Sequence, residues 1–215
     1  MITKNEYKKL LNLFNEKIGA KKSELNYYNP YQFAVAVLLS AQSTDKQVNI
    51  ATRDLFEIVD SPKAMLELGE TELKKYIRSI GFFNMKAKHI IEMSETLIEK
   101  FGGHLPKTRD ELISLSGIGR KSANVILNEL YGTPTIGVDT HVMRLVHRLD
   151  LVPSSATTPE QIEAELDKIT PEEYKTLISN ILVLYGRYEC KAQSPHCDTC
   201  YIKEFCKNKE YRKQK

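Results

Sequence analysis

All four cysteines of this 215-residue chain lie close together near its C-terminus, in the pattern Cys190-x6-Cys197-x2-Cys200-x5-Cys206. Four thiols in so short a segment are more typical of a metal site than of disulfides when nothing marks the chain for export. Structural zinc sites usually contain two short paired spacings, whereas here one tight pair stands between two longer arms. This spacing favours a Cys₄ [4Fe–4S] cluster, with zinc, disulfides or unligated thiols as the alternatives.

A second chemical signal is the stretch LSGIGRKSANVI at residues 115–126, which contains Gly117 and Gly119 one residue apart. The two glycines predict a tight turn, because glycine adopts positive φ without steric penalty. A capping box at Thr108 and Glu111 begins a short helix before the turn, and a second helical pattern follows it. Such a hairpin directs bare backbone N–H groups outward at a helix start, and that surface suits a phosphate. An ordinary turn between two helices is the alternative.

Lys121 falls in the first turn of the second helix and would place a reactive amine beside this hairpin. A lysine acts as a nucleophile only after it loses its proton. Asp139 follows later in the chain and is a candidate for accepting that proton, although either it or Thr140 is also placed to cap the next helix. A solvated surface lysine and a simple N-cap aspartate are the alternative interpretations.

Composition sets only broad limits. Apolar residues make up 41% of the chain and charged residues 27%, as in ordinary globular proteins. The net charge of +3 comes from the last fifteen residues, which hold six Lys or Arg against two Glu, so bulk charge does not predict nucleic-acid binding. The apolar run from Phe33 to Leu39 is too short to span a bilayer, and the N-terminus lacks the apolar core of a signal peptide. We therefore expect a cytoplasmic location.

The hydrophobic pattern is helical almost throughout and predicts an all-α fold with ten or so helices. The apolar run at 33–39 predicts a helix buried on all sides. Three N-cap residues followed by proline predict helix starts, at Ser61, Thr158 and Thr170. Further helices are expected over 3–18, 46–58, 71–80 (ended by Gly81), 85–101 and 171–187.

The hairpin, the later acid and the cysteine spacing together resemble the endonuclease III family, which are helix-hairpin-helix base-excision DNA glycosylases with AP lyase activity. The resemblance covers nearly the whole chain. The segments that carry it are residues 39–45 (LSAQSTD), 81–84 (GFFN), 115–126, 138–141 (VDTH) and 186–190 (GRYEC).

The resemblance implies a two-lobed helical glycosylase fold. A six-helix bundle with the helix-hairpin-helix motif would span residues 23–133, and residues 1–22 plus 134–215 would form the iron–sulfur cluster domain. The partner implied is double-stranded DNA that contains damaged pyrimidines or abasic sites, bound by a monomer in the groove between the lobes. In the cell the protein would be associated with the nucleoid through DNA.

The resemblance also implies a role for each matching residue. Lys121 would attack the sugar C1′, expel the base and form a Schiff base, after which β-elimination cuts the strand, and Asp139 would assist it. Since the damaged nucleotide must leave the stack, two side chains would fill the space. The residues implied as DNA-binding are Gln42 and Phe82, which fill the gap, and Gly117, Gly119, Arg120 and Lys191.

Three other functions are compatible with parts of the sequence. The adenine-removing glycosylases share the aspartate and the cluster, but they lack the hairpin lysine and carry an additional C-terminal domain. A non-enzymatic DNA-binding module would not need Asp139. An electron carrier would use the cluster but has no use for the hairpin.

Overall fold

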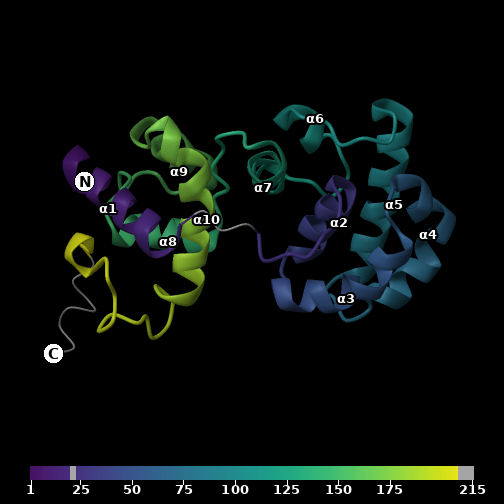
Figure 1. Ribbon diagram of the computed structural model, residues 1–215, viewed down its shortest axis with the longest axis horizontal. Coiled ribbons are helices and arrows are strands. Elements are labelled where there is room, and N and C mark those ends of the chain that lie inside the picture. Colours follow the sequence, from purple (N-terminus) through teal and green to yellow (C-terminus); the bar gives the residue numbers. More distant parts are fainter. Residues whose placement is uncertain (20–22, 208–215) are drawn as a thin grey trace. The chain divides into compact units, whose positions relative to one another are not determined.

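The computed structural model describes residues 1–19 and 23–207, and within these residues every regular element is helical (Figure 1). The all-α prediction is therefore confirmed. The α-helices in chain order are α1 (Lys4–Lys17), α2 (Pro30–Ser40), α3 (Asp45–Ile58), α4 (Pro62–Ile77), α5 (Phe83–Phe101), α6 (Arg109–Ile113), α7 (Arg120–Tyr131), α8 (Thr140–Arg148), α9 (Pro159–Ile169) and α10 (Glu172–Tyr188), followed by the 3₁₀ turn Lys203–Phe205.

The chain forms two compact units. The continuous unit is Ser23–Gly132, and the discontinuous unit combines Met1–Lys22 with Thr133–Lys215. Each unit has its own apolar core, and the helices α2 to α7 belong to the continuous unit while α1 and α8 to α10 belong to the discontinuous one. The basic residues at 208–215 lie outside the described part of the chain.

The continuous unit is built around α2. Its start is fixed by Asn29, whose side chain accepts a hydrogen bond from the Gln32 N–H, and by Pro30 at the first helical position. The residues from Tyr31 to Leu39 are all buried, which confirms the prediction for the apolar run from Phe33 to Leu39. The helices α3, α5 and α7 pack against α2, so this helix is the centre of the unit.

Two expected boundaries in the continuous unit are shifted. The helix that begins at Pro62 and the one expected over 71–80 form a single element, α4, with a kink at Gly69, where φ is +77°. The element ends at Ile77, before the Gly81 that was expected to end it. The non-helical backbone at Gly69 thus separates the two helical segments that the sequence predicted.

In the discontinuous unit, α1 packs against α10. The Phe14 ring meets the Tyr185 ring edge to face, with centroids 5.4 Å apart, and the Tyr7 hydroxyl is 2.8 Å from that of Thr170. The prediction of a helix start at Thr170 is wrong, because Thr170 is the C-cap of α9 and α10 begins after Pro171. Its hydroxyl is used by Tyr7, so α10 begins without a side-chain cap.

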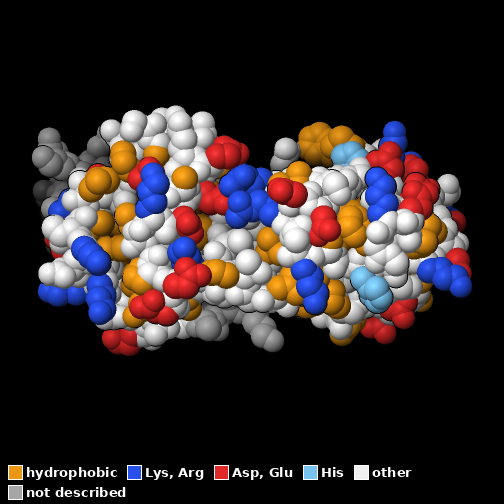
Figure 2. Space-filling model, turned by 90° about the horizontal axis from the view of Figure 1, so that it is seen from above, with side chains coloured by type: hydrophobic (Ala, Val, Ile, Leu, Met, Phe, Trp, Pro, Cys, Tyr) orange, Lys and Arg blue, Asp and Glu red, His pale blue; other side chains and the backbone are white. Residues whose placement is uncertain are grey.

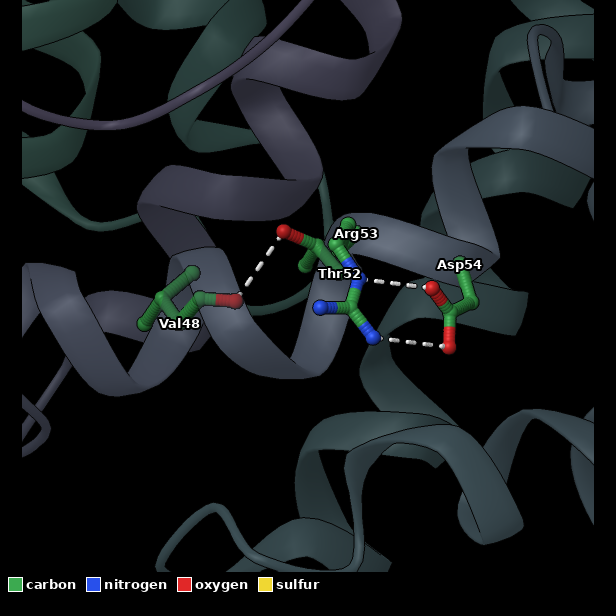
Figure 3. A network of polar contacts seen from close by, with 4 residues as sticks. All are labelled: Val48, Thr52, Arg53 and Asp54. Atoms are coloured by element: carbon green, nitrogen blue, oxygen red, sulfur yellow. Dashed lines mark hydrogen bonds and ion pairs between the residues drawn. The ribbon is translucent and has the colours of Figure 1, made fainter.

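The helices also carry local polar contacts of the usual kind. In α3 the Thr52 hydroxyl donates to the Val48 carbonyl at 3.0 Å, and Arg53 pairs with Asp54 (Figure 3). On the face shown in Figure 2, Lys and Arg side chains are interspersed with Asp and Glu. In the described residues no helix is both long and apolar enough to cross a membrane.

Candidate functional site

The glycine hairpin joins α6 to α7 and packs closely against α2 and α5 within the continuous unit. Gly117 has φ of +78°, and a Cβ on it would lie 2.7 Å from Leu38 Cδ1 and 3.0 Å from His89 Cβ. Both the backbone conformation and the close approach to α2 and α5 therefore require glycine at this position. On either side of it, Leu115 and Ile118 are buried in the core.

Gly119 differs from the expectation that both glycines adopt positive φ. It is the N-cap of α7 with φ of −91°, and a Cβ placed on it would meet no atom within 4 Å. Other residues could adopt this conformation, and serine or aspartate would cap the helix better. A glycine here instead leaves the first turn of α7 without a side-chain cap and open to approach from outside.

A side-chain hydrogen bond fixes the hairpin to α5. The Ser116 hydroxyl donates to Glu92 Oε2 at 2.6 Å. This bond is the main reason that the pKa of the Glu92 carboxyl lies below its usual value of 4.5. The hairpin is thus secured both by core packing and by a charged hydrogen bond.

Lys121 is the second residue of α7, directly beyond the open helix start, and its side chain is exposed. The neighbouring Arg120 is exposed as well. Two basic side chains and the positive end of a helix therefore occur together, which is an arrangement that attracts anions.

Gln42 and Phe82 both lie in turns with left-handed backbone. Their φ values are +55° and +59°, which is uncommon for residues other than glycine, and both are exposed, Phe82 by 62%. Phe82 precedes α5, whereas Gln42 lies between α2 and α3. The two turns are neighbours in space, because a Cβ on Gly81 would be 3.9 Å from the Gln42 carbonyl oxygen.

Asp139 belongs to the discontinuous unit and is the N-cap of α8. Its Oδ1 accepts hydrogen bonds from the N–H groups of His141, at 2.9 Å, and of Val142, at 3.0 Å. Capping therefore uses one carboxylate oxygen, and the cap fixes the direction of the other. Of the two capping residues considered from the sequence, Asp139 rather than Thr140 serves as the cap.

The four cysteines line one pocket in the discontinuous unit. None of the four forms a disulfide. The pocket has a volume of about 420 Å³, including the part that is open to solvent, and Leu145, Tyr185 and Ile202 add apolar walls. Burial and, next, the neighbouring thiols raise the pKa of the Cys197 thiol. Within the described residues, no group of three His, Cys, Asp or Glu side chains converges on a position for a single metal ion.

Two arginines on α8 connect this helix to the cysteine loop. Arg144 Nε donates to the Cys190 carbonyl at 3.0 Å, and Arg148 Nη1 lies 3.2 Å from Cys190 Sγ and 2.7 Å from the Lys191 carbonyl. Gly186 lets α10 approach the start of α8, since a Cβ there would be 2.8 Å from the His141 carbonyl oxygen. The helix that Asp139 caps is therefore tied to the cysteine loop.

The residues expected to be catalytic, DNA-binding or metal-binding are distributed over both units. Gln42, Phe82, the hairpin and Lys121 belong to the continuous unit, whereas Asp139, the cysteines and the exposed Lys191 belong to the discontinuous one. One residue beside the two turns was missed in the sequence. Lys86 is buried in the first turn of α5, and its place on the apolar stripe of that helix was the available signal.

Comparisons with known proteins identify the family. Residues 35–172 match the model of the HhH-GPD superfamily of base excision DNA repair proteins. The chain is 48% identical over 198 residues to endonuclease III of Rickettsia felis, which covers 92% of both chains. The chain belongs to the endonuclease III family. It is also 45% identical over 188 residues to endonuclease III of Escherichia coli K12, covering 87% of this chain and 88% of that one.

A solved structure of a trapped endonuclease III–DNA covalent intermediate gives a TM-score of 0.92 at 38% identity, covering 99% of each chain. A non-covalent endonuclease III–DNA complex gives the same TM-score and identity and covers both chains fully. Family membership confirms the glycosylase fold and the enzyme class inferred from the sequence. The protein is a base excision repair enzyme, a DNA glycosylase with abasic-site lyase activity.

Proposed function

We propose that this enzyme removes oxidised pyrimidines from double-stranded DNA and that Lys121 is its nucleophile. The Lys121 amine attacks C1′ of the damaged nucleotide, and the bond from C1′ to the base breaks as the base leaves with a proton. Opening of the sugar gives a Schiff base between Nζ and C1′. Loss of a proton from C2′ then expels the 3′-phosphate, and water releases the enzyme. The observation that carries this proposal is the place of Lys121, in the first turn of a helix that begins at an uncapped glycine hairpin.

Asp139 is the acid–base partner in this proposal. An attacking amine must be unprotonated, and a carboxylate can accept its proton and stabilise positive charge that develops on the sugar. The cap supports this role, because its two hydrogen bonds to Oδ1 hold the carboxylate in one orientation. One side chain would thereby serve both the fold and the chemistry.

The hairpin is proposed to bind a DNA phosphate. Glycine at 117 is explained by packing, but glycine at 119 is explained neither by φ nor by crowding. Open space beside the first N–H groups of α7 is what a phosphate oxygen requires. Arg120 adds a positive charge at the same place, and Lys191 is proposed to contact the backbone from the cysteine loop.

Gln42 and Phe82 are proposed to enter the duplex when the damaged nucleotide leaves it. Phe82 is large, apolar and 62% exposed, so its ring is accessible for stacking against a base. An inserted apolar side chain can replace a lost stacking partner, and a glutamine beside it can hydrogen-bond the base that remains. The nearness of the two turns supports a joint role.

The four cysteines are proposed to hold a [4Fe–4S] cluster. Four cysteines that form no disulfide and line one pocket with apolar walls are a suitable ligand set for it. A single zinc ion would need the ligands to converge to about 2.3 Å from one point, which fits this arrangement less well. When bound, the cluster links the four thiolates covalently and so gives the loop a fixed shape. Arg144 and Arg148 hold the same loop against α8.

Borohydride trapping tests the assignment of Lys121. Reduction fixes a Schiff base as a stable enzyme–DNA adduct, and we expect the adduct with duplex DNA that contains thymine glycol. The Lys121→Gln variant should give no adduct and no strand cleavage. Lys63→Gln is a matched control, because Lys63 is also an exposed second residue of its helix and should leave trapping unchanged.

An adduct formed by Lys121→Gln would overturn the assignment. If an adduct forms only with duplexes that contain no oxidised pyrimidine, the proposed substrate is wrong.

The proposed cluster has its own test. It predicts broad visible absorbance and four bound irons per chain, and one bound zinc per chain would refute it. We also propose that the enzyme acts in the cytoplasm, associated with the nucleoid through DNA.

A further inference from the structure

Lys86 is a lysine whose side chain is only 4% exposed. Burial lowers the pKa of this amine, since the charged form loses its hydration. Its Nζ has three oxygen neighbours, the carbonyls of Leu39 at 2.8 Å and Ala41 at 2.6 Å and the Ser43 hydroxyl at 3.4 Å. An ammonium group has three N–H donors, so each donor has an acceptor.

These acceptors surround Gln42. The carbonyls of Leu39 and Ala41 belong to the end of α2, where the last carbonyls of a helix lack partners within the helix and the helix dipole favours a positive charge. Ser43 closes the turn from the other side, because its N–H donates to the Ser40 carbonyl at 3.1 Å. Lys86 thus binds the residue on each side of Gln42.

The same lysine is also bound to Phe82. The backbone N–H of Lys86 donates to the Phe82 carbonyl at 3.0 Å, as part of the first turn of α5. A second connection runs parallel to it, since Gln47 Nε2 in α3 donates to the Ser79 carbonyl just before the Phe82 turn. Two polar ties and the close approach of Gly81 to Gln42 therefore join the turns into one structure.

The backbone at both turns explains why such ties are needed. Gln42 and Phe82 adopt left-handed conformations that cost free energy for residues with a Cβ. A strained conformation persists only when the surroundings enforce it. A buried ammonium is an expensive way to cap a helix, and an apolar residue at position 86 would fit the stripe formed by Ala87 and Ile90.

We propose that Lys86 is a positioning residue that holds Gln42 and Phe82 at a fixed spacing, so that both enter the DNA duplex together. The inference rests on the proposed function, in which these two side chains fill the space of the displaced nucleotide. Lys86 itself touches no DNA in this proposal. Substitution of Lys86 would leave Lys121 unchanged, but Gln42 and Phe82 would no longer be held at the spacing needed to fill the gap.

The test compares strand cleavage at an abasic site in duplex DNA with cleavage at an abasic site in single-stranded DNA. Only the duplex has a stack that must be kept open, so only the duplex reaction needs the two turns. For Lys86→Met we expect the ratio of duplex to single-strand kcat/KM to fall by about tenfold to a hundredfold, the range for misplaced groups. The single-strand rate should change by less than about twofold.

Gln32→Met is the matched control for loss of a buried polar group. Gln32 is 1% exposed and its Nε2 donates to the carbonyls of Phe56 and Val59, at the opposite end of α2. Gln32→Met should lower the free energy of unfolding as Lys86→Met does, but it should leave the ratio of duplex to single-strand kcat/KM unchanged. When Gln42→Ala is already present, Lys86→Met should lower the ratio by a smaller factor than it does alone, since both changes impair the same filling of the gap.

Each failure is distinguishable. If Gln42→Ala and Phe82→Ala leave the ratio unchanged, the proposed gap filling is wrong. If these two lower the ratio but Lys86→Met lowers it no more than Gln32→Met, only the positioning role is wrong. If Lys86→Met does not fold, Gln47→Ala decides: it removes the parallel tie from a partly exposed position and should lower the ratio severalfold, so an unchanged ratio would overturn the proposal.

Discussion

The two hairpin glycines should respond oppositely to alanine. In Gly117→Ala, the residue must keep φ of +78°, which costs a residue with a Cβ about 1–2 kcal/mol. Its Cβ would also lie 2.7 Å from a Leu38 methyl and 3.0 Å from His89 Cβ. Overpacking of a core contact of this kind costs about 1–3 kcal/mol, even though the Leu38 side chain can shift a little.

The sum is a loss of about 2–5 kcal/mol in the free energy of unfolding, before any relaxation. For a chain of this size, each kcal/mol lowers Tm by about 2–4 °C, so Gly117→Ala should melt about 4–20 °C lower. Gly119→Ala meets no atom at φ of −91°, and its restriction of the unfolded chain is offset by the poorer capping of a helix by alanine, so its Tm should change by no more than a few degrees. Its Cβ would instead stand in the space proposed for a phosphate.

Thermal unfolding by circular dichroism and binding to a duplex with a non-cleavable abasic analogue measure the two effects. Gly117→Ala should lose stability, whereas Gly119→Ala should keep stability and lose about tenfold or more in affinity, as when a phosphate contact is removed. The reasoning fails if Gly119→Ala melts as low as Gly117→Ala. It also fails if Gly119→Ala binds the analogue as tightly as the unaltered protein, because the open helix start would then have no role in binding.

Three further predictions concern other parts of the site. Asp139→Asn keeps an N-cap residue, so Tm should stay within a few degrees while base excision falls at least a hundredfold, and an active variant would refute the acid–base role. Gly186→Ala places a Cβ 2.8 Å from the His141 carbonyl, so Tm should fall by several degrees and iron content should drop; normal iron content would contradict this. The pKa of Glu92 is lowered, so the stability it contributes is present above pH 4.5 and is lost as the pH falls through the lowered value. The Tm difference between Glu92→Gln and the unaltered protein should therefore become smaller below pH 4.5. If this difference does not change with pH, the ionised carboxylate of Glu92 is not its cause.

The elements were largely predictable because their signals are local. Asn29 before Pro30, Ser61 before Pro62 and Thr158 before Pro159 all begin helices, as a cap followed by proline indicates. Thr170 before Pro171 has the same pattern but ends a helix instead. Its hydroxyl is bound by Tyr7, a residue distant in the chain, and no local pattern contains that information.

The types of residue in the candidate site could be predicted from the sequence, but the contacts that hold them in place could not. Gly117 and Gly119 look equivalent in the sequence, yet only the first is required by φ and by packing, because the crowding comes from α2 and α5. Lys86 could not be distinguished in the sequence from other helix lysines. Its two nearest partners are backbone carbonyls, which every residue has. Assignments of Lys121, Asp139, Gln42 and Phe82 to catalysis and DNA binding remain predictions.

The discontinuous unit has a consequence for synthesis of the protein on the ribosome. The helix α1 is made before the continuous unit, whereas its partners Thr170 and Tyr185 are made after it. The apolar face with Tyr7, Leu10, Leu11 and Phe14 is therefore without its native cover while the whole continuous unit emerges and can already fold. The four cysteines also follow the continuous unit in the chain, so assembly of the proposed cluster and burial of α1 both come after that unit has been made. A truncated product would accordingly expose an apolar helix that degradation systems can recognise.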